Sequence, residues 1–537
     1  MISFVATRNL HEKTTMRNYT SLSLSFIVAV FTTFIADNSF AQTGPAGVGS
    51  SAENQIWLDA HALSFAAGAS VSTWTDLSGN GANFFQGTSL KQPIYNTTGI
   101  AGLPSLTFDG VNDVMASGSI PALESANVSY FIVYDRTTTT SDMLINADYT
   151  SSFKKWRTYM NNGQITVNSA HFSPSINWVR YNDPAGASFL STHISPTNIS
   201  LYNQGNLEHS KSATYSLPTG HNNIFIGNRS ATAISSYTYT GEMSEVIVYN
   251  GTLNDLERIL IENYLGAKYG MTIPSDYYAY ETTHKFGLIG LGDDGTNSQT
   301  TAQGAGVLEL SGAVDLNAGE YLLVANTDNS VSEYDLVDVP AELPAHQRLL
   351  RTWRAGETGD AGITTLTFHL GDDDYAVPDS YRLLVDGDGT FSDATIYTGT
   401  HDDGAHTITF EVNLADGDYF TVSGILEILE IHSIVDGLWS EESTWDCDCI
   451  PAANDFVYID PGTTVTVDVN AFTDLLRIEF TGSVIMSADS TLDINGDWEI
   501  LGTTDITGGT VSLTGDEAQD VTIISTAAVV VGLHNLL

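Results

Sequence analysis

Short runs of β-branched and aromatic residues, each ended by Gly, Asn or Asp, recur through the chain and restrict its possible folds. Strands of this length bounded by turn residues are typical of β-sandwiches. The chain is 42% hydrophobic and 10% aromatic, so it has enough apolar side chains to fill several cores. The pattern therefore predicts an all-β protein. Its clearest early strands are Gln55–Leu58, Ser105–Phe108, Tyr130–Tyr134, Asn223–Ile226 and Glu245–Tyr249.

One helical pattern follows these strands. Asn254 can cap a helix and has Glu257 three residues later, which is the spacing of a capping box. Gly270, directly after the pattern, is typical of a helix end. We expect a helix that serves as a packing element. Its apolar face consists of Leu256, Ile259, Leu260 and Tyr264.

Length and charge limit the organisation and the partners of the chain. At about one domain per 150 residues, 537 residues suggest about three domains. The chain has 19 Lys and Arg against 64 Asp and Glu, a net charge of −45 that would repel nucleic-acid phosphates and anionic lipids. Nucleic acid is therefore excluded as a partner. The acidic side chains serve either solubility in a salty medium or the binding of divalent cations.

The first 41 residues read as an N-terminal extension and a signal peptide. Met16 is the expected start, an apolar run extends from Leu22 to Ala36, and Ala41 precedes the expected cleavage site. No later segment has about 18 consecutive apolar residues, so the mature chain is expected to have no membrane span. The predicted location is secreted or at the cell surface.

Four motifs occur in a fixed order in residues 42–273: Ile56–Ala60, Trp74–Gly81, Phe108–Gly110 and Gly241–Tyr249. This region resembles the laminin-G-like, concanavalin A-like jelly rolls of bacterial surface proteins. The resemblance implies two packed antiparallel sheets and, in many relatives, a calcium-dependent face for a sugar or another ligand.

Two further modules are expected. Residues 274–425 resemble a β-sandwich module that often follows such a jelly roll and has no assigned activity. Residues 426–537 contain short strands at near-regular spacing, which predict a β-solenoid. The opening of this segment, with Gly437–Ser440 and Thr444–Trp445, resembles the entry to the right-handed β-helix modules of bacterial surface proteins. The solenoid is expected to be incomplete, because a last rung needs a cap and the frame stops at Leu537. We therefore expect the reading frame to be truncated. The solenoid strands are Thr464–Val467, Leu476–Ile478, Thr491–Ile494 and Thr510–Leu513.

Cys447 and Cys449 are the only cysteines, so no disulfide framework joins the modules. A disulfide between them would close a small, strained ring. Two sulfurs without a nearby pair of histidines do not make a structural zinc site. The expectation is a structural pair of thiols, in preference to a redox or metal role.

Catalytic motifs are absent from the sequence. A glycosidase on this fold would need two carboxylates, commonly spaced as E-x-D-x-E or E-x-D-x-x-E, and neither spacing occurs. Glu427 and Glu430 lack the middle Asp and are interpreted as linker charges. No G-x-S-x-G, H-E-x-x-H or P-loop motif is present either. We therefore predict no catalytic residue.

The candidate calcium ligands are oxygen side chains in two glycine-containing turns, where backbone carbonyls could complete a shell of oxygens. Asp, Asn and Gly also make turns without any ion. Glu242 and Glu245 could contribute, although Glu residues on strands are usually exposed. The four candidates are Asp76, Asn80, Asp109 and Asp113.

Other acidic segments are interpreted as solvated turns. The segment Asp386–Thr390 begins like an EF-hand loop but has Phe391 at the sixth position and Tyr397 at the twelfth, where a Gly and a Glu are required. The same interpretation applies to Asp372–Asp374 and Asp293–Gly295.

No ligand-binding residue is assigned from the sequence. Sugars are usually held against an aromatic ring, and Trp74 lies beside an acidic turn, but Trp57 and Trp74 fit strand positions in a core better.

The leading functional hypothesis is a secreted, non-catalytic binding or adhesion protein that recognises an extracellular polysaccharide or a surface glycoprotein with Ca²⁺. The alternatives are a polysaccharide-active enzyme, either a glycoside hydrolase or a lyase, and a structural component of the cell surface.

Overall fold

The computed structural model confirms the all-β prediction. It describes residues 44–523, and the predicted signal peptide, Asp372–Asp374, Glu427 and Leu537 lie outside the described residues. Within 44–523 the gaps are 125–126, 138–141, 151–152, 162, 170–177, 184–185, 213–222, 230–236, 305–306, 330, 332–333, 336–337, 344–345, 370–379, 403, 426–429, 448, 453–454, 489 and 514–520.

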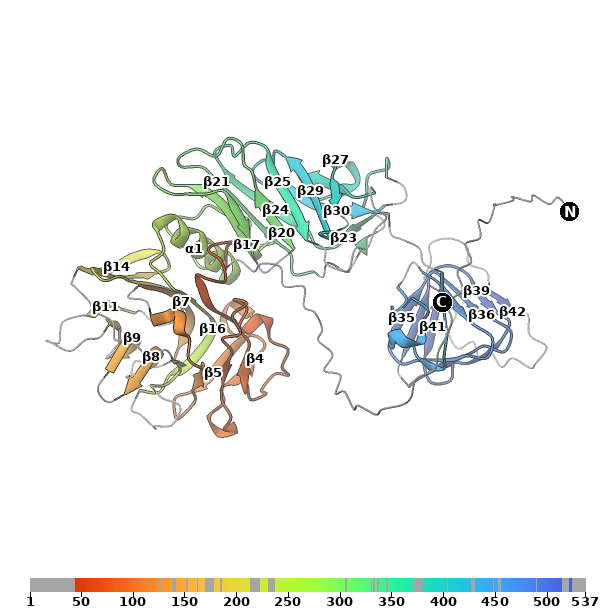
Figure 1. Cartoon of the computed structure of the whole chain (residues 1–537), viewed down its shortest axis with the longest axis horizontal. Helices are drawn as coiled ribbons and strands as arrows, with labels where there is room; N and C mark the ends of the chain where they lie inside the picture. The colour runs from red at the N-terminus through yellow and green to blue at the C-terminus, as the bar shows by residue number, and fades with distance from the viewer. Residues whose placement is uncertain are drawn as a thin grey trace, which may run out of the picture. The chain divides into compact units, whose positions relative to one another are not determined.

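The first module is a sandwich of two antiparallel sheets (Figure 1). The β7 sheet has the order β14 (Asn206–Ser212), β13 (Asn198–Asn203), β12 (Gly186–Ile194), β7 (Val128–Arg136), β16 (Thr240–Tyr249), β5 (Ser105–Asp109) and β4 (Ile94–Asn96), and β1 (Asn54–Asp59) also pairs with β16. The β9 sheet has the order β11 (Trp178–Asn182), β10 (Gln164–Ser169), β9 (Phe153–Asn161), β8 (Met143–Thr150), β15 (Ile224–Ile226), β6 (Met115–Ala116), β3 (Phe84–Phe85) and β2 (Thr73–Trp74).

The core of this module lies between the two sheets, because residues that alternate along each strand share one face. Tyr130, Ile132 and Tyr134 of β7 point into this core, which also contains Trp74 and Trp156. Trp74 is fully buried and Trp57 is 5% exposed, as predicted, so neither can be a sugar platform. The more specific laminin-G-like assignment stays a prediction.

Helix α1 (Asp255–Tyr269) has the predicted capping box of Asn254 and Glu257. Gly270 follows the helix in the left-handed conformation, with a φ of 61°. The helix covers the other face of the β7 sheet, where its buried side chains join Phe131 and Val133 in a second core. Residues of β17 and β21 in the next module complete this core, so α1 is the packing element that the sequence predicted.

The second module is also made of antiparallel strands. One sheet has the order β18 (Ser298–Gln299), β17 (Phe286–Asp293), β21 (Tyr321–Asn326), β24 (Trp353–Thr358), β30 (Tyr419–Gly424), β23 (Gln347–Leu349) and β22 (Tyr334–Asp335), with β26 (Arg382–Asp386) between β30 and β27 (Thr395–Thr398). The other has the order β19 (Thr301–Gln303), β20 (Leu308–Ser311), β25 (Thr364–His369), β29 (Thr407–Val412) and β28 (Thr400–Asp402). Its core is separate from that of the first module.

The third module has parallel strands, as a solenoid requires. It has three sheets. The first has the order β31 (Glu430–His432), β33 (Phe456–Ile459), β36 (Leu475–Ile478), β39 (Trp498–Ile500) and β42 (Val521–Ile523). The second has the order β32 (Gly437–Leu438), β34 (Thr464–Val467), β37 (Ser483–Met486) and β40 (Thr503–Asp505), and the third has the order β35 (Asn470–Thr473), β38 (Thr491–Ile494) and β41 (Thr510–Leu513). Alternate residues of each strand, such as Val457 and Ile459, fill a core of stacked rungs.

Six short 3-10 helices complete the described elements: η1 (Ala60–Ala62), η2 (Ser89–Lys91), η3 (Ile100–Gly102), η4 (Pro121–Glu124), η5 (Phe391–Asp393) and η6 (Glu442–Thr444). Among the described helices, none combines the length and the apolar character that crossing a membrane requires.

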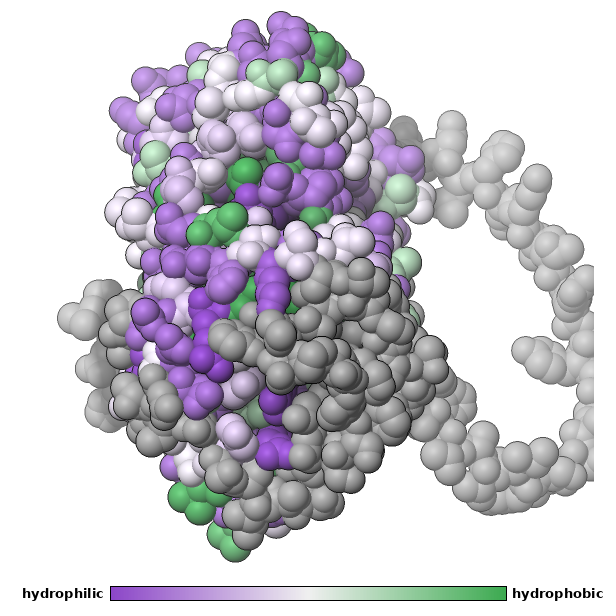
Figure 2. All heavy atoms as spheres, turned by 90° about the vertical axis from the view of Figure 1, so that its left-hand side faces the viewer, coloured by the Kyte–Doolittle hydropathy of each residue, from purple (hydrophilic) through white to green (hydrophobic). Residues whose placement is uncertain are grey.

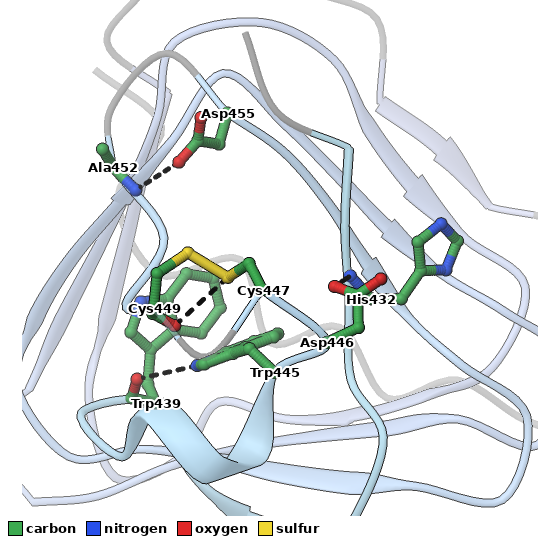
Figure 3. The surroundings of a disulfide bond; sticks show 8 residues. All are labelled: His432, Trp439, Trp445, Asp446, Cys447, Cys449, Ala452 and Asp455. Carbon is green, nitrogen blue, oxygen red and sulfur yellow. Dashed lines mark hydrogen bonds between the residues drawn. A yellow bond between two sulfur atoms is a disulfide. The ribbon is translucent and has the colours of Figure 1, made fainter. Parts of the chain in front are cut away.

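The prediction of free thiols is wrong, because Cys447 and Cys449 form a disulfide in the first rung of the solenoid (Figure 3). Their Cα atoms are 5.1 Å apart, within the range of roughly 4.4–6.8 Å that disulfides span, so one intervening residue is enough. Beside the disulfide, the fully buried rings of Trp439 and Trp445 meet edge to face, with their ring centres 5.0 Å apart.

Candidate functional site

The first pair of predicted calcium ligands holds a turn together. The carboxylate of Asp76 accepts hydrogen bonds from the backbone N–H groups of Trp57, Ser78 and Ala82 at 2.8–3.1 Å, and from the Ser78 hydroxyl at 2.7 Å. The side chain of Asn80 donates to the carbonyl oxygens of Ser51 and Asn54, at 2.8 Å each. These polar atoms thus fix the chain around β1 and β2.

The second pair lies in a separate turn after β5. Asp109 accepts hydrogen bonds from the backbone N–H groups of Val111 (2.7 Å) and Asn112 (3.2 Å), and Asp113 accepts one from the N–H of Asp109 (2.9 Å). Burial, followed by the charge of Asp109, raises the pKa of Asp113 to about 6. In the part of the chain that is described, no three His, Cys, Asp or Glu side chains lie close enough to hold a metal ion. Calcium at these residues stays a prediction.

The other acidic segments form turns whose carboxylates accept backbone hydrogen bonds. Asp386 accepts from the N–H groups of Asp388, Gly389 and Thr390 at 2.6–3.1 Å. Asp293 accepts from the N–H of Gly295 at 2.7 Å.

Two of the motifs meet in a buried charged network. Lys268 of α1 donates to Asp59 of β1 (2.5 Å) and to Glu245 of β16 (2.8 Å). Glu245 is fully buried, so the expectation of an exposed strand residue is wrong. It also accepts hydrogen bonds from the Trp57 indole (2.9 Å) and from the hydroxyls of Tyr264 (2.7 Å) and Tyr269 (2.8 Å). This network is closed to ligands and joins α1 to the β7 sheet.

His193 of β12 is a buried histidine beside α1. The side chain of Ser129 is 2.9 Å from its Nδ1, and its Nε2 has no hydrogen-bond partner among the described residues. Burial, followed by the charge of Arg258, lowers the pKa of His193 to about 3. The folded state therefore holds this imidazole neutral.

We expect His193 to make stability depend on pH. Between the folded pKa of about 3 and an unfolded pKa of about 6.5, only the unfolded chain binds a proton, so stability falls as the pH drops below about 6.5. Protonation of His193 in the unfolded chain alone should lower the free energy of unfolding by about 2 kcal/mol between pH 7 and pH 5. Urea unfolding of the wild type and of His193→Gln at both pH values measures it. Identical pH dependence of the two proteins would contradict the assignment.

A cavity of about 310 Å³ lies at one end of the β7 sheet and contains two facing carboxylates. Asp135 of β7 and Glu242 of β16 are directly opposite each other in the antiparallel pair. Asn96 donates to Glu242 at 2.8 Å. Burial, followed by the charge of Glu242, raises the pKa of Asp135.

A second group of polar side chains lies on the face of the β9 sheet that points away from the core. Trp156 and Met160 of β9 point into the core, so Arg157 and Tyr159, which alternate with them, point outwards. Asn146 of β8 is directly opposite Arg157, and β8 and β9 run side by side in Figure 1. Tyr159 also meets Tyr237 edge to face, with ring centres 6.0 Å apart.

Two guanidinium groups lie against these rings. The Arg157 guanidinium is 4.4 Å from the centre of the Tyr159 ring, and that of Arg229 is 5.2 Å from the Tyr237 ring. Asn146 donates to the carbonyl of Arg229 at 3.2 Å. We call these five residues, Asn146, Arg157, Tyr159, Arg229 and Tyr237, the arginine–tyrosine cluster.

The cluster has a buried floor and a partly exposed rim. Asn146 is fully buried and Arg157 is 8% exposed, whereas Arg229 and Tyr237 are partly exposed. Within the described residues, the Oδ1 atom of Asn146 and the Nε of Arg157 have no hydrogen-bond partner. Two polar groups in one buried floor thus keep unused hydrogen-bonding capacity, which usually costs stability unless a ligand or water satisfies it.

The sequence interpretation missed this cluster. Its signal was the run of Lys154, Lys155, Trp156 and Arg157, which places three of only 19 basic residues within four positions. Arg229 and Tyr237 have no such signal, because they reach the cluster from a different part of the chain. Figure 2 shows mainly hydrophilic side chains among the coloured atoms of the molecular face it presents, with hydrophobic ones in small separate groups.

A family model described as a domain of unknown function (DUF8202) matches residues 291–418, which lie in the second module. No curated protein matches the chain.

Several solved structures share part of the arrangement. They include domain 4 of AbnA, a GH43 extracellular arabinanase from Geobacillus stearothermophilus, in complex with arabinotriose (TM-score 0.29, 15% identity, 39% of this chain and 97% of that one). The botulinum neurotoxin serotype D binding domain gives a TM-score of 0.31 at 10% identity, over 69% of this chain and 96% of that one. The CBM40 of the Ruminococcus gnavus IT-sialidase, bound to α2,3 sialyllactose, gives 0.24 at 12% identity, over 28% and 92%. At TM-scores this low, the likenesses carry no argument about function.

Proposed function

We propose that the chain is a non-catalytic, extracellular glycan-binding protein whose binding surface is the arginine–tyrosine cluster on the β9 sheet. The observation that carries the proposal is the combination of two tyrosine rings with unsatisfied polar atoms on one sheet face. Sugar rings present apolar C–H faces edged by hydroxyl groups, so a site for them needs an aromatic surface next to hydrogen-bonding groups. The extracellular location rests on the predicted signal peptide.

A glycan array probed with the full chain tests this proposal. We expect Tyr237→Ala to weaken binding to the glycans that the wild type recognises by about tenfold, because the variant loses an aromatic contact at the partly exposed rim. Tyr458→Ala is the matched control, since Tyr458 is a partly exposed tyrosine on the solenoid. Unchanged binding by Tyr237→Ala, or no glycan bound by the wild type, would contradict the proposal.

The same array, run with calcium and then with a chelator, tests the predicted cation. Binding that requires calcium would support a role for ligands among Asp76, Asn80, Asp109 and Asp113. Binding that persists in the chelator would separate glycan recognition from these residues.

A second candidate function, polysaccharide cleavage, is favoured by the carboxylates of Asp135 and Glu242 in their cavity. Glycosidases use two facing carboxyl groups, one of which must stay protonated, and the raised pKa of Asp135 fits that role. New reducing ends in a polysaccharide panel would favour this function over binding alone. If the chain neither binds nor cleaves any of these glycans, the remaining hypothesis is a structural component of the cell surface.

A further inference from the structure

We propose that the arginine–tyrosine cluster recognises a sugar that carries a carboxylate, which Arg157 and Arg229 bind through their guanidinium groups. The inference rests on the proposed function and names the class of glycan that this site takes.

The first step is the position of positive charge in a strongly negative chain. The net charge of −45 repels anions at long range, so an anion can be held only where basic side chains lie close together. Arg157 and Arg229 lie against two tyrosine rings that contact each other. Burial lowers the pKa of Arg157, and the nearby positive charge of Arg229 lowers it further.

The second step is what Arg157 lacks. Its side chain is almost entirely buried, and within the described part of the chain its Nε has no hydrogen-bond partner and no ion pair is formed to it. A buried guanidinium is costly unless an anion or several acceptors satisfy it. A planar carboxylate matches the fork of N–H donors on a guanidinium and can accept two parallel hydrogen bonds.

The third step is why the anion belongs to a sugar. The Oδ1 of Asn146, directly opposite Arg157, is an unused acceptor in the same floor. An anion alone cannot donate to it, whereas a sugar hydroxyl can. Tyr237 at the rim can pack against the ring that joins the two groups. A sugar acid therefore matches both unsatisfied atoms and also supplies the negative charge that the guanidinium lacks, which a neutral sugar cannot supply.

Calorimetric titration of the full chain tests this inference. The probes are galacturonic acid oligomers and N-acetylneuraminic acid, each compared with its methyl ester, and a sulfated neutral oligosaccharide. We expect at least one acid to bind at least about tenfold more tightly than its ester and than the sulfated probe, and its affinity to fall as salt is added.

The variants locate the effect. Arg157→Gln should weaken binding of the acid by about tenfold or more and change binding of the ester much less, and Arg157→Lys should not restore the affinity, because an ammonium group lacks the planar fork. Arg477→Gln on the solenoid surface is the control. The acid-to-ester ratio of the wild type tests the inference even if an Arg157 variant fails to fold.

Three outcomes would overturn the inference. If every acid and its ester bind equally, or if Arg157→Gln binds the acid as the wild type does, the carboxylate is not the recognised group, although glycan binding itself would stand. Tighter binding of the sulfated probe would replace the carboxylate by a sulfate ester. If no glycan binds, the proposed function fails as well.

Discussion

Replacing Lys268 by methionine is expected to lower the free energy of unfolding by about 3–5 kcal/mol. Methionine fills a similar volume, so the loss comes from the charge. Lys268 is the cation between Asp59 and Glu245, and all three side chains are buried. Without it, two carboxylates face each other without a counter-charge in a site of low polarity.

The electrostatics of the network support this direction. Burial disfavours the charged form of Lys268, but the carboxylates of Asp59 and Glu245 outweigh burial, and the pKa of Lys268 is raised. Burial raises the pKa of Glu245, and the charge of Lys268 counteracts that rise. In the variant, Glu245 should therefore take up a proton at a higher pH than in the wild type, and part of the lost stability should return as the pH is lowered.

Urea unfolding of Lys268→Met and of the wild type, compared with each other at pH 7 and again at pH 5, measures both effects, because the contribution of His193 is common to the two proteins. Lys211→Met is the matched control, because Lys211 lies partly exposed on the edge strand β14 and its removal should change stability by less than about 1 kcal/mol. An unfolding midpoint equal to that of the wild type would show that α1 is held to the β7 sheet by its apolar contacts alone.

The same network shows what sequence patterns could and could not predict. The motifs Ile56–Ala60 and Gly241–Tyr249 can be recognised from the sequence. The sequence does not reveal the contacts that explain why these motifs contain the residues they do. Trp57 and Glu245 are separated by 188 positions, and Lys268 and Asp59 by 209. Alternation along a strand assigns a side chain to a face, yet it does not say which helix will cover that face. The sequence alone therefore assigns Glu245 to an exposed strand position, whereas the packing of α1 on the sheet buries it.

The arginine–tyrosine cluster has the same limitation. Alternation along β9 is local and could have placed Arg157 and Tyr159 on one face. Arg229 and Tyr237 join them only through the packing of a distant segment, which no period in the sequence encodes. The capping box of α1 was predictable because it involves only Asn254 and Glu257, three residues apart. The cysteine prediction is wrong because the separation of the Cα atoms, and not the size of the ring, decides whether a disulfide can form.

Replacing Trp445 by alanine is expected to cost about 3–5 kcal/mol in the solenoid, because the side chain is fully buried in its first rung. The Trp445 indole donates to the carbonyl oxygen of Trp439 at 3.1 Å, as Figure 3 shows, and its backbone forms a bridge with Ser433. The variant would leave a cavity next to Trp439 and remove the donor for that carbonyl group.

The damage should spread along the solenoid, since a rung buries its inner face only against its neighbours. Hydrogen exchange should therefore become faster in the strands stacked on the first rung, β33 and β34, and less so in β39, while β7 and β16 keep their wild-type rates. Phe472→Ala is the control, because Phe472 is 43% exposed on the outer surface of β35. Wild-type exchange rates throughout the solenoid of Trp445→Ala would mean that the later rungs are stable without the first, and that the core of Val457, Leu476 and Trp498 alone is sufficient.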